Sequence, residues 1–542
     1  MAQEIWKNPG WTPTEAPRIP GAPATLDHSL PVRIGYVLIG IVCALAGNLG
    51  NALITANLPH VQGSLHLTPA EGQWLVGGYA MMNCWANLLL FKFRIQYGIR
   101  AFAQLSLIAY AVLCVLQVFV HDYPAALLTR AASGLAAAPL FAMTSLYFIQ
   151  AAGQAKLFKA AMVGLTMPQI VIPLAFLIVP PLNDLAEPQL PYLLEAGLAL
   201  LALALVVAFP LPYSARAKVF ERADLVALAL FVPGMALMVA VLAQGATQWW
   251  TDRAWLGIAL AASIALLVAG LAWEYRRPNP LLFVRWLATG DVLFFIVGAL
   301  IVRFLTNEQT IGSVGFLRLV GMGPDQLAPL YAVIILASLA GLATMMLVAG
   351  PKNTFWVILA AVLLIAFGCF IDRDATPLDR PRDFFLSQAI IGFANALFVG
   401  PLLLVGIQKV IRDGAQYVVS YFAVFAFTQS VGSILGSAVL NTLQVFREHE
   451  ASAVLTTQLQ ATDPLVQARL AAGSGGVAGQ LTDPALQAAE SAATLGQSST
   501  LNANTLAYND LFSAIGALAL AYAIVLVVRF GLAQRNTGGK AA

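Results

Sequence analysis

The chain has 542 residues, of which 59% are hydrophobic and only 10% are charged, and its net charge is +3 at pH 7. Soluble domains carry about 45–50% apolar and roughly 25% charged residues, so this composition excludes a cytosolic enzyme, a nucleic-acid-binding protein and a disordered scaffold. The apolar residues come in long runs, and a membrane-spanning helix needs about 20 of them. The sequence therefore predicts an all-α polytopic membrane protein.

The N-terminal segment, residues 1–32, is rich in proline and carries mixed charge. It lacks the basic and then apolar layout of a cleaved signal peptide. We expect a short cytoplasmic tail there, followed by a first span that serves as its own insertion signal.

About fourteen apolar runs follow in chain order. They lie near residues 33–58, 71–91, 99–120, 123–150, 159–182, 189–211, 223–245, 254–274, 290–313, 325–349, 354–371, 384–408, 416–445 and 508–530. An even number of spans places both termini on one side of the membrane. Most lysines and arginines fall in the segments that are cytoplasmic if the N-terminus is inside, which is the distribution that the positive-inside rule expects. We predict that both termini are cytoplasmic.

The polar segment 447–507, between the last two predicted spans, is rich in Ala, Gln and Ser. It contains Asp463-Pro464 and Asp483-Pro484, and an Asp followed by Pro is a helix-start signal. We predict two short helices separated by a Gly-rich turn at 473–476. The segment is interpreted either as a hairpin that covers the outer mouth or as a docking surface for a periplasmic partner.

Three ionisable side chains lie inside predicted spans, where insertion costs at least ~2.5–3.5 kcal/mol each. Arg130 lies in the fourth span, and Arg303 and Glu308 lie in the ninth. Arg303 and Asn307 are four residues apart and share a helix face, whereas Glu308 is about 140° from Arg303 and does not form a simple intrahelical pair with it. Each arginine either links helices or acts in function. For Glu308 a functional role is favoured, because a carboxyl group in apolar surroundings can carry a proton near neutral pH.

Polar amides and hydroxyls inside the spans predict a polar cavity. Asn48, Asn51 and Thr55 form a stripe on the first span, and Asn395 of the twelfth is included with them. Glu195, which opens the sixth span, is a minor candidate. Four other carboxylates fall at helix ends, where solvated boundary positions suffice: Glu71, Asp224, Glu274 and Asp291.

Motifs for enzymatic chemistry are missing from the sequence. Nothing resembles a phosphate-binding loop, a zinc site or a nucleophile–base pair. The cysteines lie inside apolar runs, where a thiol behaves as a small hydrophobe: Cys43, Cys84, Cys114 and Cys369. We therefore predict no enzymatic activity, no cofactor, no metal site and no disulfide.

A series of short motifs occurs along the chain, and their order is informative about the family. They are Asn57-Leu58-Pro59 with Trp74 and Tyr79, the basic loop 91–100, Arg130 with Gly134, the segment 249–252, Gly432 to Asn441, and the segment 506–512. In this order the chain resembles transporters of the major facilitator superfamily. More narrowly, over residues 33–530, it resembles their fourteen-span drug:proton antiporters of the EmrB type.

This resemblance implies a major facilitator fold of two six-helix bundles, over 33–211 and 290–530, with two extra central helices over 223–274 and a cytoplasmic tail over 531–542. The segment 447–507 belongs to the second bundle. Spans one, four, nine and twelve are then expected to line the cavity. The substrate-cavity candidates are Asn48, Asn51, Thr55, Arg303, Asn307, Glu308 and Asn395, and the proton-coupling candidates are Glu308, Arg130 and Arg303.

The implied function is export of small amphipathic or aromatic compounds by proton-coupled antiport and alternating access. Two cations inside the spans, Arg130 and Arg303, favour an anionic substrate such as an aromatic acid as the alternative. The resemblance further implies a bacterial inner membrane location, with lipid, protons and the substrate as partners and no nucleic acid. It also implies an EmrA-like membrane-fusion adaptor and a TolC-type outer-membrane channel, which together with this chain would form a tripartite efflux system.

The chain departs from this family at sites linked to proton coupling. The family's acidic residue of the first span corresponds to about Gly50, and Pro180-Pro181 occupies the place of a glycine pair in span five. Proton coupling therefore does not follow from those motifs, and Glu308 is the candidate acid. Two alternatives remain open: a facilitator or importer of an organic anion, and a non-transporting membrane component that recruits a periplasmic partner.

Overall fold

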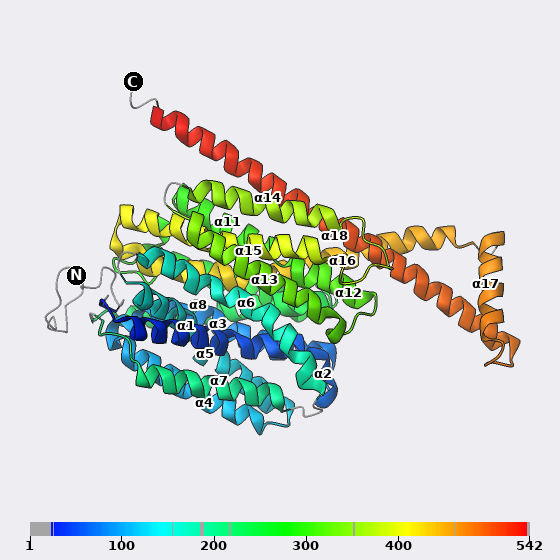
Figure 1. The fold of residues 1–542 in the computed structure, drawn as a ribbon, viewed down its shortest axis with the longest axis horizontal. Helices are drawn as coiled ribbons and strands as arrows, with labels where there is room; N and C mark the ends of the chain where they lie inside the picture. The colour runs from blue at the N-terminus through cyan, green and yellow to red at the C-terminus, as the bar shows by residue number, and fades with distance from the viewer. Residues whose placement is uncertain are drawn as a thin grey trace.

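The protein is represented by a computed structural model that describes residues 23–24, 26–153, 156–184, 189–214, 216, 218–350, 353–460 and 462–538. Within these residues, thirteen helices are long and apolar enough to cross a membrane. Helix α3 (Pro69–Tyr97) is less apolar but has 29 residues and packs between α5 and α8 inside the bundle (Figure 1). The all-helical fold class is confirmed. Most of the predicted N-terminal tail, and residues 539–542 of the C-terminal one, lie outside the described residues.

The first group of helices surrounds α1 (Leu30–Ala56), which packs against α5, α6 and α7. Prolines sit at the first turns of α1, α3, α5 and α7, where the missing N–H group has no helical partner to lose. The remaining helices of this group are α2 (Leu58–Ser64), α4 (Ile99–Val118), α5 (Tyr123–Ala152), α6 (Leu157–Asp184) and α7 (Leu190–Ala208).

Helices α8 (Arg222–Gln248) and α9 (Ala254–Arg276) pair with each other, and α8 packs against α3 and α16. Short α10 (Val284–Leu287) leads to the last group, in which α13, α14 and α15 pack together and α6 packs across onto α13 and α15. The helices of this group are α11 (Gly290–Leu305), the π-helical turn η2 (Glu308–Ser313), α12 (Val314–Leu319), α13 (Pro324–Val348), α14 (Thr354–Asp372), α15 (Phe385–Asp413), the 3-10 turn η3 (Ala415–Tyr417), α16 (Val418–Gln458), α17 (Pro464–Val477) and α18 (Pro484–Gly538).

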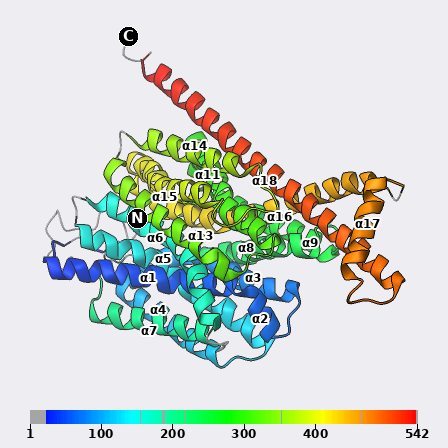
Figure 2. The same cartoon turned by 45° about the vertical axis from the view of Figure 1, so that its right-hand side comes forward.

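The two ends of the bundle differ. The start of α1 and the end of α18 lie at one end, here called the near end, and α2 and α17 lie at the other, the far end (Figure 1). At the far end α16, α17 and α18 project beyond the other helices as a hairpin (Figure 2). An ion pair joins α16 to α18 at the base of this hairpin, with Arg447 Nη2 2.6 Å from Asp510 Oδ2.

The hairpin corrects part of the prediction for residues 447–507. The first short helix exists as α17, capped by Asp463, whose Oδ1 accepts the Leu465 N–H at 2.7 Å. The second short helix is wrong, because the helix that starts at Pro484 continues for 55 residues as α18. The Gly-rich turn is also wrong, since residues 473–476 are helical. A Cβ on Gly473 would lie 2.3 Å from Ser491 Oγ, so this glycine allows α17 to pack closely on α18.

Two carboxylates predicted at solvated boundaries are instead buried in a charge network at the near end. Asp224 is fully buried and Glu274 is 1% exposed. Lys92 Nζ donates to both Asp224 carboxylate oxygens at 2.8 Å, and Arg277 lies 2.9 Å from Asp224 and 2.7 Å from Glu274. The helix ends come together in the fold, so these side chains neutralise each other instead of facing solvent. The network ties α3 to α8 and α9.

Candidate functional site

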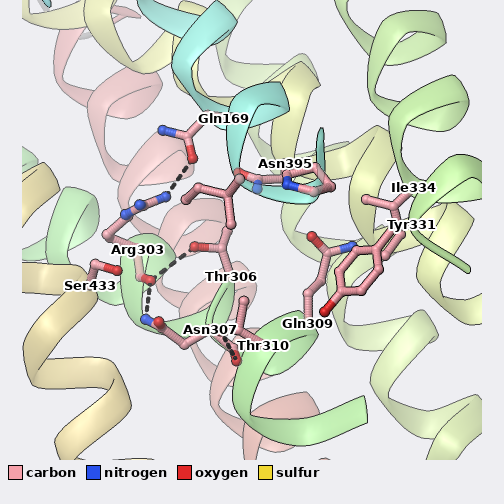
Figure 3. A pocket seen from close by; sticks show the side chains of 12 residues that line it. Gln169, Arg303, Thr306, Asn307, Gln309, Thr310, Tyr331, Ile334, Asn395 and Ser433 are labelled. Atoms are coloured by element: carbon pink, nitrogen blue, oxygen red, sulfur yellow. Dashed lines mark hydrogen bonds between the residues drawn. The ribbon is translucent and has the colours of Figure 1, made fainter. Parts of the chain in front are cut away.

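A polar cavity of about 70 Å³ lies where α6 meets the last group of helices. It is lined by Gln169, Ile172 and Pro173 of α6, Arg303 of α11, Thr306, Asn307, Gln309 and Thr310 around η2, Tyr331 and Ile334 of α13, Asn395 of α15 and Ser433 of α16. Most of these side chains carry an amide, a hydroxyl or a charge (Figure 3). The cavity therefore brings together residues from helices that are far apart in the sequence.

Arg303 is the cationic group of this cavity. Its Nη1 donates to Gln169 Oε1 at 2.6 Å, and its Nε donates to the Gln429 carbonyl at 3.2 Å. Among the described residues no carboxylate lies within 4.0 Å of its guanidinium group, so its charge has only neutral partners. A partly buried cation with only neutral partners attracts an anionic ligand group.

Two neutral groups of the lining also lack a partner. The Oδ1 atom of Asn395 and the hydroxyl of Tyr331 are buried, and neither has a hydrogen-bond partner among the described residues. Buried polar groups in native proteins are nearly always hydrogen-bonded. The ring of Tyr331 also stacks on Phe176, with the ring centroids 4.7 Å apart. The lining thus offers a cation, hydrogen-bonding groups and an aromatic surface.

The structure places only some of the predicted cavity residues in the lining of this cavity. Arg303, Asn307 and Asn395 line the cavity, but Asn48, Asn51 and Thr55 are not part of its lining. The amide of Asn48 donates to the Ala44 carbonyl at 2.9 Å, and the hydroxyl of Thr55 donates to the Asn51 carbonyl at 2.8 Å. These two side chains are therefore satisfied by the backbone of their own helix.

Glu308 lies outside the lining of the cavity, in a separate buried cluster with Asp372. The two residues are 0% and 5% exposed. The Ser313 hydroxyl donates to Glu308 Oε1 and lies 3.4 Å from Asp372 Oδ2. The amide nitrogen of Gln388 is 3.2 Å from Glu308 Oε1 and 3.2 Å from Asp372 Oδ2. The two carboxyl groups thus share the same two neutral partners.

This acid pair has no cation to balance it. In the described part of the chain, no lysine, arginine or histidine lies within 4.0 Å of either carboxyl group. Two adjacent carboxylates cannot both stay ionised in apolar surroundings without a counter-ion, because burial and like charge both oppose ionisation. The chemistry that this arrangement allows is the uptake and release of a shared proton.

The π-helical turn η2 explains why Arg303 and Glu308 face different surroundings. Helix α11 ends at Leu305, and η2 begins at Glu308. Such turns insert an extra residue into a helix and often occur at functional sites. As predicted, Arg303 and Glu308 do not pair, and η2 lies between the cavity and the acid pair.

Arg130 belongs to a third cluster, in the first group of helices. It is 2% exposed, and its Nη2 donates to Asn51 Oδ1 at 3.0 Å while its Nη1 lies 3.4 Å from Glu195 Oε2. The Tyr110 hydroxyl donates to the other Glu195 oxygen at 2.9 Å. The minor candidate Glu195 is therefore the carboxylate partner of Arg130.

Comparison with known proteins identifies the family to which this chain belongs. The family model of the Major Facilitator Superfamily matches residues 39–437, and the chain therefore belongs to this family of membrane transporters. No curated protein sequence matches the chain significantly.

Solved structures of transporters share the fold at 12% sequence identity. The human organic anion transporter MFSD10 (TETRAN) has a TM-score of 0.54, over 90% of this chain and 99% of that one. A point mutant of the nucleoside transporter NupG has a TM-score of 0.52, over 93% and 100%. The proton:xylose symporter XylE, bound to 6-bromo-6-deoxy-D-glucose, has a TM-score of 0.54, over 91% and 96%. The major facilitator fold is confirmed, and the narrower resemblance to EmrB-type drug:proton antiporters stays a prediction.

Proposed function

We propose that this protein exports small amphipathic or aromatic organic anions by proton-coupled alternating access. The observation that carries the proposal is Arg303, a cation in the central cavity whose described partners are all neutral. The unpaired polar atoms of Asn395 and Tyr331 supply hydrogen bonds to the same ligand, and the ring of Tyr331 gives it an aromatic wall. One structural neighbour with this fold is itself an organic anion transporter.

The size of the cavity fits a closed stage of such a cycle. Its volume of about 70 Å³ is well below the roughly 300–1,000 Å³ of sites that enclose small organic ligands. Substrate entry therefore requires the helices around the cavity to separate. Rocking of two helix bundles about a central site provides that opening in transporters of this kind.

The proposed proton carrier is the Glu308–Asp372 pair. Glu308 is the first residue of η2, five residues beyond Arg303 on the same chain segment, and Asp372 is the last residue of α14. A change in the charge of the pair alters the hydrogen bonds that Ser313 and Gln388 make to it. We propose that this change moves η2 and thereby alters the cavity that Arg303 lines.

The test uses purified protein in liposomes and two fluorescent probes of similar size and opposite charge, naphthalene-1-sulfonate and N-methylquinolinium. The membrane potential is clamped at zero with potassium and valinomycin, and a pH gradient is imposed. We expect the sulfonate to accumulate against its gradient, to stop doing so when an uncoupler is added, and to be preferred to the quinolinium. Equilibration without accumulation would favour a facilitator. Failure to move either probe, with the protein folded, would contradict the proposed substrate class.

We propose that the hairpin of α16, α17 and α18 contacts a periplasmic adaptor of a tripartite efflux system. In this proposal the protein lies in a bacterial inner membrane with its far end on the periplasmic side. The projection of the hairpin from the bundle (Figure 2) and its exposed apolar side chains, Val454, Leu465 and Leu486, support this proposal.

Replacing residues 448–509 with a short Gly-Ser linker removes the hairpin at its base, where Arg447 and Asp510 already meet at 2.6 Å. We expect sulfonate transport in liposomes to persist and efflux from intact cells to fall, because the core transports alone and only the cell needs the adaptor. Loss of liposome transport in a folded variant would show that the hairpin belongs to the transport core. Unchanged cellular efflux would contradict its role in docking.

A further inference from the structure

A carboxylate from α7 fills a space that α1 leaves open. A Cβ atom built on Gly50 would lie 2.0 Å from Glu195 Oε1 and 2.1 Å from its carboxyl carbon. Any side chain at position 50 would therefore occupy the place of the Glu195 carboxyl group. Because position 50 on α1 is a glycine, the carboxylate beside Arg130 can come from Glu195 on α7.

The Arg130–Glu195 ion pair is loose in comparison with the network at the near end. Its single contact measures 3.4 Å, and Arg130 Nε is buried with no hydrogen-bond partner among the described residues. A strong arginine–carboxylate pair has two parallel bonds of about 2.7–2.9 Å. By contrast, Asp224 is held by two cations at 2.8 and 2.9 Å. The Arg130–Glu195 pair is therefore held less tightly than the Asp224 network.

Arg130 has other partners that can hold its charge if Glu195 becomes neutral. Its Nη2 already donates to Asn51 Oδ1 at 3.0 Å, and its guanidinium carbon lies 4.9 Å from the centroid of the Tyr79 ring. An aromatic ring at this distance stabilises a buried cation. Protonation of Glu195 therefore does not leave Arg130 as an isolated charge.

A pocket of about 190 Å³ at the far end reaches Arg130, the partner of Glu195. Arg130 is part of its lining, and the others are Ile54, Ser64, Leu65, Leu75, Gln117, Val118, Val120, His121, Ala126, Gln189 and Tyr192. Four of these residues, Leu65, Val120, His121 and Gln189, lie in the connections between helices at the far end. The volume holds several water molecules, and its polar groups can bond to them. Water, and with it protons, can reach Arg130 from this end of the bundle.

The remaining titratable groups that face Glu195 are neutral when Glu195 is ionised. They are Tyr110 and Cys114 on α4, Tyr79 on α3 and Tyr192 on α7 itself. Helix α1 contributes only Gly50, the Asn51 amide and the Ala46 carbonyl, whose oxygen lies 2.7 Å from the Tyr110 hydroxyl oxygen. Arg130 is thus the one charged partner of Glu195 among the described residues.

We propose that Glu195 is a second proton-exchange site, which takes up and releases a proton through the far-end pocket and so releases Arg130 from Glu195, while the bond from Arg130 to Asn51 remains. A proton passes from water in the pocket to Glu195 Oε2, and the pair changes from net neutral to a charge of +1. This inference rests on the proposed proton-coupled transport and adds one proton per cycle to the one carried by Glu308–Asp372. It assigns Glu195 a direct role in coupling and Gly50 the role of making room for it.

The number of exchanged protons can be read from substrate accumulation. At zero membrane potential, each proton exchanged per anion multiplies the accumulation ratio by about ten for a gradient of one pH unit, since one pH unit is a tenfold ratio. In liposomes with naphthalene-1-sulfonate we therefore expect about 100-fold accumulation for the parent protein, about tenfold for Glu195→Gln and none for Glu195→Gln with Glu308→Gln. Counterflow of labelled for unlabelled sulfonate needs no gradient and should survive in all three. Glu490→Gln, at an exposed site on the hairpin, is the matched control.

A second pair of variants tests the geometry. Gly50→Asp alone should be inactive, because its side chain collides with the Glu195 carboxyl group. Gly50→Asp combined with Glu195→Ala should regain coupling, because it returns one carboxylate to the same space beside Arg130. Coupling that stays lost in a double variant with intact counterflow would overturn the proposal.

Infrared difference spectra between high and low pH supply a readout that needs no substrate. We expect the C=O band of a buried carboxylic acid at low pH in the parent and in Glu308→Gln, with one component missing from Glu195→Gln. An unchanged band in Glu195→Gln would show a static ion pair and would overturn the proposal, whatever the transport result. Failure of the parent to accumulate sulfonate, with this component present, would contradict the proposed function and leave Glu195 as an exchanging acid.

Discussion

Glu308→Gln is expected to lower gradient-driven accumulation of naphthalene-1-sulfonate by about tenfold at one pH unit, while counterflow continues. The substitution keeps the size of the side chain and removes the acid that shares Ser313 and Gln388 with Asp372. The remaining carboxyl group is buried without a cation, so it stays protonated throughout the cycle. The measurement is the accumulation ratio in liposomes at zero membrane potential.

The Glu308–Asp372 pair also predicts that the losses of accumulation caused by substituting its two residues do not add. Because Glu308 and Asp372 share one proton, Asp372→Asn should cause the same loss as Glu308→Gln, and the double variant should lose no more than either. Losses that multiply in the double variant would mean that the two residues exchange separate protons. Full coupling in either single variant would remove the pair from the mechanism.

Arg303→Gln is expected to weaken binding of naphthalene-1-sulfonate by about 100-fold, because removing one partner of a buried charge pair typically costs about 2–5 kcal/mol. The probe's own fluorescence gives the dissociation constant directly. Arg303→Lys should recover part of the affinity, since it restores the charge but not the planar group that reaches both Gln169 and Gln429.

Arg318→Gln is the matched control for this prediction. Arg318 lies on α12, is exposed and stands over the Phe176 ring at 5.3 Å, outside the lining of the cavity. We expect its affinity for the sulfonate to stay close to that of the parent. An Arg303→Gln variant that folds and binds the sulfonate as tightly as the parent would refute the anion-binding role of the cavity.

The membrane-spanning helices could be predicted because each is long and apolar, which is a local property of the sequence. The lengths of the helices in the hairpin could not be predicted from the sequence. The signal at Asp483-Pro484 correctly marks a helix start, but the continuation of α18 into the membrane depends on packing against α14, α16 and α17. Residues 473–476 are helical, and the close approach of Gly473 to Ser491 on α18 is a tertiary contact that local sequence does not show.

For the cavity, periodicity shows which residues share a face but not which helix that face meets. Arg303, Asn307 and Asn395 line the cavity, whereas Asn48 and Thr55 bond to carbonyls four residues earlier in their own helix. Such local bonds are always open to Asn and Thr side chains. Sequence spacing alone could not exclude them.

The acid pair shows what sequence patterns miss. Asp372 ends an apolar run beside a loop with Arg373, Arg380 and Arg382, so the sequence favours a place for it in a charged loop. In the structure Arg373 pairs with Asp374 instead, and Asp372 points into the protein. A signal was present in the position of Asp372 directly after the apolar run 354–371. Its pairing with Glu308 depends on how α14 packs, which no local pattern reveals.

Helices α16 and α18 run without a break from the bundle into the hairpin, and this continuity makes the hairpin a lever. At 1.5 Å per residue the 55 residues of α18 measure about 80 Å, more than twice the roughly 30 Å thickness of a bilayer core. A tilt of only about 10° about one end moves the other end of such a rod by about 14 Å. In the proposed transport cycle, tilting of the membrane-embedded helices would therefore be amplified at α17, and a partner bound there would be displaced with each cycle.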